Sequence, residues 1–110
     1  MTQIGSLIRV QEGFRGRLRT LALDVELSLW RCEASGEKAP DYRVHRGGGA
    51  AGPEVGAAWK QHGEKAGDYF AVVLDDPSFA QPIRATLVRV GHDDAWALLW
   101  SRRSRRQAAA

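Results

Sequence analysis

Hydrophobic and polar residues alternate along most of this chain with a period of two residues. Residues 13–21 read GFRGRLRTL, for example, so Arg15, Arg17 and Arg19 occupy every second position. Successive side chains of a β-strand point to opposite faces, so this period predicts strands with one buried face rather than helices. Segments rich in Gly, Pro or charge interrupt the pattern about every eight to twelve residues. The predicted strands are residues 4–10, 14–23, 24–32, 41–45, 54–61, 69–74, 83–90 and 95–102.

This arrangement predicts an all-β fold, a single small antiparallel barrel or sandwich of about seven to eight short strands with little helix. The sequence does not distinguish a barrel from a sandwich, because both folds require the same alternation of hydrophobic and polar residues. The segment Ile4–Val10 is a candidate edge strand, and Val55, Ala57 and Trp59 form the apolar face of residues 54–61. The prolines of DDPSFAQP, residues 75–82, are expected to interrupt pairing, with one helical turn at most after Asp76.

The basic character of the chain is concentrated at its carboxyl end. The 110 residues carry 16 Lys or Arg, 13 Asp or Glu and a net charge of +3. Four of the arginines lie within SRRSRRQAAA, so the rest of the chain is close to neutral. This length fits one domain. We therefore expect a single β domain over residues 1–101 and a basic, disordered tail over residues 102–110.

The composition excludes several classes of protein. Cys32 is the single cysteine, so the chain forms no internal disulfide and no cysteine-based zinc site. No apolar run approaches the roughly 20 residues of a membrane span, and the first residues, MTQIGSLIRV, do not resemble a secretion signal. We expect a cytoplasmic protein with no membrane partner.

No residue type appears in a spacing that indicates catalysis or metal binding. The three histidines are too far apart for a zinc motif, and the two Asp-Asp pairs precede prolines or turns, where aspartate commonly caps. Neither Cys32 nor any serine has the local setting of a catalytic nucleophile. We therefore predict a protein that is not an enzyme and has no cofactor, no metal and no catalytic residue. The residues considered were His45, His62, His92, Asp75, Asp76, Asp93, Asp94, Cys32, Ser28, Ser78 and Ser101.

With catalysis and metal binding set aside, the arginine-rich segments favour nucleic-acid binding. A one-sided arginine row on a strand is suited to phosphate contact, and Lys60 beside Trp59 is a candidate platform for stacking. An ordinary explanation stands beside it, in which Glu12 or Glu26 neutralises the row. Trp96 and Trp100 fit a core better than a stacking surface. The predicted nucleic-acid-binding residues are Arg15, Arg17, Arg19, Lys60, Arg102, Arg103, Arg105 and Arg106.

Long runs of this sequence resemble one bacterial family, domain of unknown function 736. The resemblance spans residues 3–102 and rests on GFRGRLRTLALDVEL, KAPDYRVH, EVGAAWK and EKAGDYFAVVLDDPSFAQPIRATL, in that order, with departures at GGGAAGP and in the tail. It implies a short protein of conjugative plasmids and integrated mobile elements. It brings no activity and no catalytic residue.

The sequence thus favours a non-enzymatic accessory protein of mobile elements that binds DNA or RNA through backbone contacts, without base readout. The alternative is a protein-interaction module that pairs with a second copy, with a partner in the transfer apparatus or with a host defence protein that it inhibits.

Overall fold

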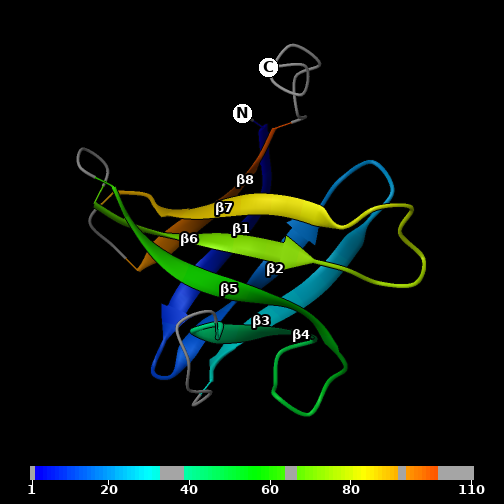
Figure 1. Ribbon diagram of the computed structural model, residues 1–110, viewed down its shortest axis with the longest axis horizontal. Coiled ribbons are helices and arrows are strands. Elements are labelled where there is room, and N and C mark those ends of the chain that lie inside the picture. The colour runs from blue at the N-terminus through cyan, green and yellow to red at the C-terminus, as the bar shows by residue number, and fades with distance from the viewer. Residues whose placement is uncertain (1, 33–38, 64–66, 92–93, 102–110) are drawn as a thin grey trace.

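The computed structural model describes residues 2–32, 39–63, 67–91 and 94–101, and it shows a closed β-barrel (Figure 1). Each strand pairs antiparallel with the next, and β8 pairs with β1 to close the barrel. The all-β prediction is confirmed, and the barrel rather than the sandwich is formed. Within the described ranges there is no helix long and apolar enough to cross a membrane. The strands are β1 (Thr2–Val10), β2 (Gly13–Arg19), β3 (Asp24–Arg31), β4 (Tyr42–Arg46), β5 (Glu54–Gly63), β6 (Gly67–Leu74), β7 (Ile83–Arg89) and β8 (Ala95–Trp100).

All eight predicted strands are present, with differences at their ends. The second ends at Arg19, because the Thr20 hydroxyl accepts hydrogen bonds from the amides of Ala22 (3.2 Å) and Leu23 (3.0 Å) and so forms a turn. Segment 75–82 interrupts pairing as expected, but it forms a turn and no helix, in which the Ser78 amide donates to the Asp76 carboxylate at 2.9 Å.

The prediction that Ile4–Val10 is an edge strand is wrong. In β1, Leu7 pairs with Gly16 of β2 on one side and with Trp96 of β8 on the other. Closing the barrel satisfies the backbone groups that an edge strand would leave open. Gly16 allows β1 and β2 to approach closely, because a Cβ at this position would collide with the Ser6 carbonyl oxygen.

Inward-facing side chains fill the barrel and form its core. Phe14, Val44 and Leu87 are fully buried, and Ala58 and Leu98 pack in the same cluster. Small barrels of this strand number have an interior that side chains can fill.

The predicted apolar face of residues 54–61 is divided: Val55 packs against the core, whereas the other two residues lie on the outer side. Ala58 and Lys60 point inward, because they lie opposite the inward-facing Val72 and Phe70 of β6. Ala57 and Trp59 therefore lie on the outer side, half-buried.

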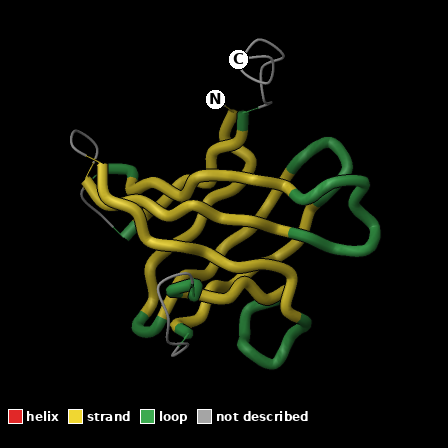
Figure 2. The backbone as a smooth tube through the Cα atoms, in the orientation of Figure 1, coloured by secondary structure: helices red, strands yellow, loops and turns green. Residues whose placement is uncertain are grey.

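The two ends of the barrel carry different sets of connections. The turn after Val10 and the connections after β3, β5 and β7 leave from one end, which we call the open end. The loops 20–23, 47–53 and 75–82 leave from the other, which we call the closed end. Figure 2 shows loops 20–23 and 75–82 close together at the right and the β1–β2 turn at the lower left.

Candidate functional site

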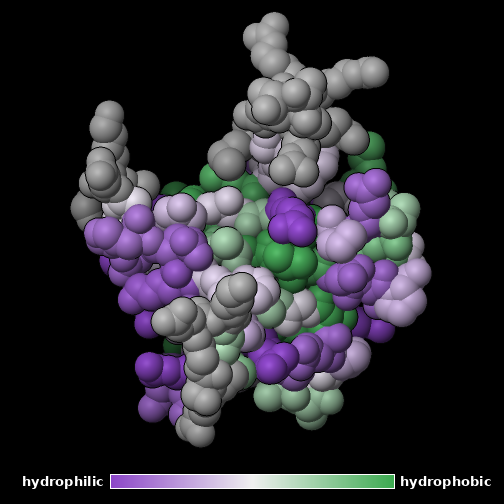
Figure 3. All heavy atoms as spheres, viewed as in Figure 1, coloured by the Kyte–Doolittle hydropathy of each residue, from purple (hydrophilic) through white to green (hydrophobic). Residues whose placement is uncertain are grey.

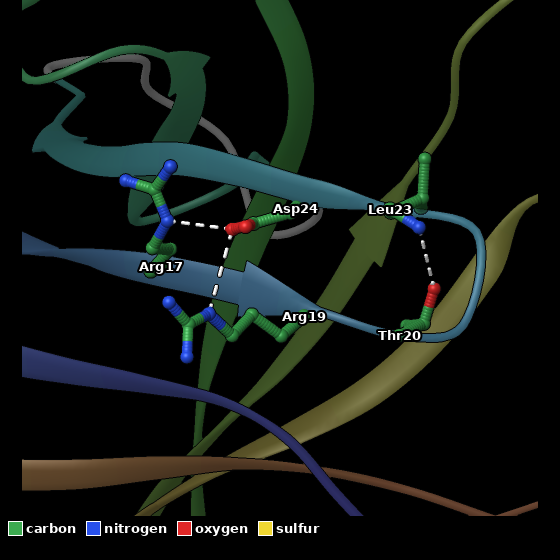
Figure 4. A network of polar contacts seen from close by, with 5 residues as sticks. All are labelled: Arg17, Arg19, Thr20, Leu23 and Asp24. Carbon is green, nitrogen blue, oxygen red and sulfur yellow. Dashed lines mark hydrogen bonds and ion pairs between the residues drawn. The ribbon is translucent and has the colours of Figure 1, made fainter.

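The predicted arginine row lies on the outer face of β2 and is largely paired with carboxylates. Arg17 Nε donates to Asp24 Oδ1 at 2.6 Å, and Arg19 Nε lies 3.5 Å from the same oxygen (Figure 4). Arg15 Nε lies 3.4 Å from Glu26 Oε2. The Arg17 hydrogen bond holds the pKa of Asp24 below its usual value. The row therefore presents three arginines against two carboxylates, which weakens its attraction for phosphate.

The other predicted binding residues do not lie on the outer face of β2. Lys60 lies on the inner face of β5 near the open end, with its Nζ 3.4 Å from Asp68 Oδ2. Its neighbour Trp59 is on the outer side, so the two do not form one stacking platform. Arg102, Arg103, Arg105 and Arg106, with the predicted tail, lie outside the described residues.

Lys60 belongs to a ring of four basic residues at the open end. Each odd-numbered strand contributes one inward-facing basic side chain to this ring, which we call the basic ring. Below it, each even-numbered strand contributes one aromatic side chain to an aromatic layer. Each basic residue lies directly opposite an aromatic one in the strand register: Arg9 with Phe14, Arg31 with Tyr42, Lys60 with Phe70, and Arg89 with Trp96.

The aromatic layer is packed edge to face around Phe14. The ring centroid of Phe14 lies 5.6 Å from that of Tyr42, 5.5 Å from that of Phe70 and 5.1 Å from that of Trp96, with interplanar angles of 68° to 78°. Edge-to-face pairs at such distances stabilise aromatic clusters beyond their buried area. Phe14, Phe70 and Trp96 are all buried. The layer therefore separates the apolar core from the open end.

Above the aromatic layer lies a cavity of about 570 Å³, which we call the mouth. Its described lining includes the four basic side chains and two carboxylates, Asp41 and Asp68. Figure 3 shows hydrophilic side chains gathered at the left of the molecule, over the β5–β6 end. Because four basic side chains and two carboxylates line the mouth, positive charge exceeds negative charge among its described residues.

The two carboxylates are held on the β4 to β6 side of the mouth. Asp41 Oδ2 accepts a hydrogen bond from the Lys60 backbone amide at 2.7 Å. Asp68 contacts His62 Nδ1 at 2.8 Å as well as the Lys60 ammonium. Hydrogen bonds from His62 and then Lys60 lower the pKa of Asp68, so it stays ionised near neutral pH.

The arginines lie on β7, β1 and β3, with Arg9 on β1 across the barrel from β5 and Arg31 next to Cys32, whose amide donates to the Asp41 carbonyl. Arg9 and Arg31 are exposed, and among the described residues no carboxylate forms an ion pair with either. The Arg9 guanidinium lies 5.6 Å from the Phe14 ring centroid, a cation–π distance that holds it over the aromatic layer. Because β8 joins β1, the arginines of β7, β1 and β3 follow one another around the rim.

This arrangement is suited to binding an anion. Arginine presents planar donors that match phosphate and carboxylate oxygens, and the aromatic layer supplies an apolar floor. Among the described residues, no group of three or more His, Cys, Asp or Glu side chains could hold a metal ion. Cys32 lines the mouth, and its thiol beside Arg43 raises the pKa of that guanidinium.

Sequence reasoning missed Arg9, Arg31 and Arg89. Each is the last inward-facing basic residue of its strand, and an aromatic residue occupies the first inward-facing core position after the following turn. Taken singly, each basic residue is an ordinary polar strand end. A basic residue before the turn and an aromatic residue after it recur at every second turn, and this repetition is the sequence signal that could have predicted the site.

Comparison with known proteins adds one family and no activity. A family model described as a protein of unknown function, DUF736, matches residues 3–103. No curated protein and no solved structure matches the chain.

Proposed function

This chain belongs to the DUF736 family, and we propose that it is a non-enzymatic module that binds nucleic acid through phosphate contacts made at the mouth of its barrel. Such binding is independent of base sequence, because contacts to phosphates carry no information about the bases. The sequence resemblance implies an accessory protein of conjugative plasmids and integrated elements, and such a setting favours DNA or RNA as the ligand.

The observation that supports this proposal is the convergence of Arg9, Arg31, Lys60 and Arg89 on one cavity. Side chains from four separate strands reach it, so the charge density there is set by the fold and not by a local charge run. The outer row of β2 has less positive charge to offer, because Glu26 and Asp24 lie against it. Phosphate binding is therefore proposed at the mouth, with the row as a weaker, secondary contact.

Binding to phosphates releases counterions, so affinity should fall steeply as salt increases. Fluorescence anisotropy with short single-stranded and double-stranded DNA and RNA, titrated at several salt concentrations, measures both affinity and its salt slope. We expect the double variant Arg9→Ala/Arg31→Ala to lose at least about tenfold in affinity and to have a shallower salt slope.

A matched control removes the same charge from the outer wall. Arg15→Ala/Arg17→Ala deletes two arginines of the row, and we expect a smaller loss of affinity than for the mouth variant. The opposite ranking would place binding on the outer face of β2. Absence of binding to every nucleic acid at low salt would refute the proposed function.

A second candidate is a protein-interaction module, favoured by apolar side chains exposed beside the mouth. Ile8 is 56% exposed and Val90 is 50% exposed, and both line a shallow hollow of about 540 Å³ on the outer wall. Apolar side chains gathered around a hollow are typical of interaction surfaces. Size-exclusion chromatography with light scattering tests self-association, and Ile8→Ser should abolish any dimer. A monomer at all concentrations would count against pairing with a second copy.

A further inference from the structure

The mouth is a blind cavity, which restricts the kind of phosphate it can take. Its floor is the aromatic layer, in which Phe14 has no exposed surface and Phe70 retains 3%. Below that layer, Val44 and Leu87 are also fully buried. The described residues, which include all eight strands, therefore leave no passage from the mouth through the barrel, and a ligand must enter and leave at the open end.

A continuous polynucleotide cannot thread such a cavity. An internal phosphate is a diester with chain on both sides, so it can lie across the rim but cannot descend between Arg9, Arg31 and Arg89 without folding the strand back. A terminal phosphate has chain on one side only. It also carries about −1.5 to −2 charge near neutral pH and presents three acceptor oxygens, as a phosphomonoester does on a protein.

We propose that the mouth binds the terminal phosphomonoester of a nucleic-acid strand, with the end nucleotide lying against the aromatic layer. This inference rests on the proposed function and names its ligand. The cavity of about 570 Å³ falls within the range of about 300–1,000 Å³ usual for small-molecule pockets. Tyr42, Phe70 and Trp96 all line it, and Tyr42, which is only half-buried, gives a base or sugar most of the aromatic surface to contact.

The charges of the mouth define where the phosphate lies. Asp41 and Asp68 occupy the β4 to β6 side, and Asp68 lies within 3.4 Å of the Lys60 ammonium. The phosphate is therefore directed toward Arg9 and Arg31, because the described carboxylates form no ion pair with either of them. Guanidinium groups from two different strands can each offer two parallel donors, and three oxygens of a terminal phosphate provide enough acceptors for both.

The test compares strand ends of different chemistry on one DNA sequence. An internally labelled single strand is prepared with a 5′-phosphate, with a 3′-phosphate, with hydroxyl groups at both ends, and as a closed circle. Anisotropy titrations should show at least one phosphorylated strand binding about tenfold tighter than the hydroxyl-ended strand and the circle. A tenfold change in Kd is about what the loss of one hydrogen bond to a charged group produces.

The outcomes separate this inference from the proposed function. Equal affinity for all four strands, the circle included, overturns end binding but leaves phosphate-backbone binding in place. No binding to any strand overturns both. Competition with a free mononucleotide distinguishes the source of the phosphate: a mononucleotide that binds as tightly as the phosphorylated strand would replace the strand end as the ligand.

Variants then locate the preference. Arg31→Ala should bring the ratio between phosphorylated and circular strands close to one, and Arg31→Lys should restore part of it, because charge returns without the planar donors. Arg84→Ala is the control, since Arg84 is an exposed arginine on the outer side of β7. Far- and near-ultraviolet circular dichroism verifies the fold of each variant. If one variant fails to fold, Arg9→Ala gives the same test, and an unchanged ratio in folded Arg9→Ala and Arg31→Ala refutes the site.

Discussion

The two ends of the barrel surround the same core with side chains of opposite chemistry. At the closed end, Leu23, Val55, Phe79 and Ile83 pack against the core and extend it into the loops. At the open end, the last inward-facing positions of the odd-numbered strands carry the basic ring above the aromatic layer. The alternation that makes a strand decides only which side chains point inward. Their chemistry then determines whether an end extends the core or forms a cavity.

The loops show the same contrast. Loop 75–82 is fixed by Asp76, whose carboxylate accepts from the Ser78 amide and whose backbone carbonyl accepts from the Phe79 amide at 2.8 Å. This turn places Phe79 over the closed end, beside a hollow of about 190 Å³ that Leu18 and Leu74 also line. A second hollow at the same end, of about 510 Å³, is lined mainly by apolar side chains such as Leu21 and Trp100, whereas the open-end cavity of about 570 Å³ is lined by charged ones. An anionic ligand is therefore expected at the open end.

The largest expected difference between the two ends is in their contribution to stability. Phe14→Ala should lower the free energy of unfolding by about 3–5 kcal/mol, because it removes the central ring of the aromatic layer. Phe79→Ala, at the closed end, should cost roughly 1–3 kcal/mol, since Phe79 is only half-buried. Urea unfolding followed by tryptophan fluorescence measures both. Equal losses would show that the closed end contributes as much to the core as the aromatic layer does.

Charge reversal at each end should affect binding unequally. Arg31→Glu places a carboxylate in the mouth, and we expect at least about tenfold weaker binding to single-stranded DNA. Arg46→Glu makes the same change at the closed end, where Arg46 lines the small hollow, and should leave affinity within about twofold. Anisotropy titration at one low salt concentration compares them. Similar losses would mean that affinity follows net charge and not the mouth.

A smaller effect of opposite sign is expected at Asp68. Asp68→Asn removes one of the two described carboxylates of the mouth and releases the Lys60 ammonium from its ion pair, so affinity for DNA should rise about two- to threefold. The gain should shrink as salt increases. Asp24→Asn is its control on the outer row. If the control tightens binding more than Asp68→Asn does, phosphate contacts lie mainly on β2.

The smallest expected effect is on stability in acid. Hydrogen bonds from Ser78 lower the pKa of Asp76, and those from His62 and Lys60 lower the pKa of Asp68. A lowered folded-state pKa contributes stability above the unfolded value, near 3.9, and that contribution disappears as the pH falls through the folded value.

Urea unfolding between about pH 5 and pH 2 measures this loss. Asp76→Asn and Asp68→Asn should each be less stable than the parent chain near pH 5, and the difference should vanish at the acid end. A difference that is constant over the whole range would assign the effect to packing and not to ionisation.

Strands were predictable from the sequence because alternation is a local property. Phe14 and Leu18 opposite the arginine row, or Trp96 and Leu98 on one face, follow from spacing alone. Closure was not predictable, because it depends on pairing β1 with β8, which lie at opposite ends of the chain. The prediction of an edge strand failed for the same reason.

The candidate site was only partly predictable. Glu26 was foreseen as a neutralising residue, whereas Asp24 was not, because its position depends on the register that the short turn at Thr20 sets. Lys60 was predicted as a binding residue, although for its neighbour Trp59 and not for its place in the basic ring. A ring assembled from four strands has no local signature until the barrel closes.

Pairing of the first and last strands also makes the barrel a candidate for circular permutation. Thr2 lies opposite Trp100 in the register of β1 and β8, so a short linker can join the strand ends there. New chain ends opened in loop 47–53, at the closed end, would leave every connection at the open end uncut. Circular permutation is tolerated where the new chain ends lie in an exposed connection. The order in which the strands are synthesised can therefore be changed while the mouth keeps all of its side chains.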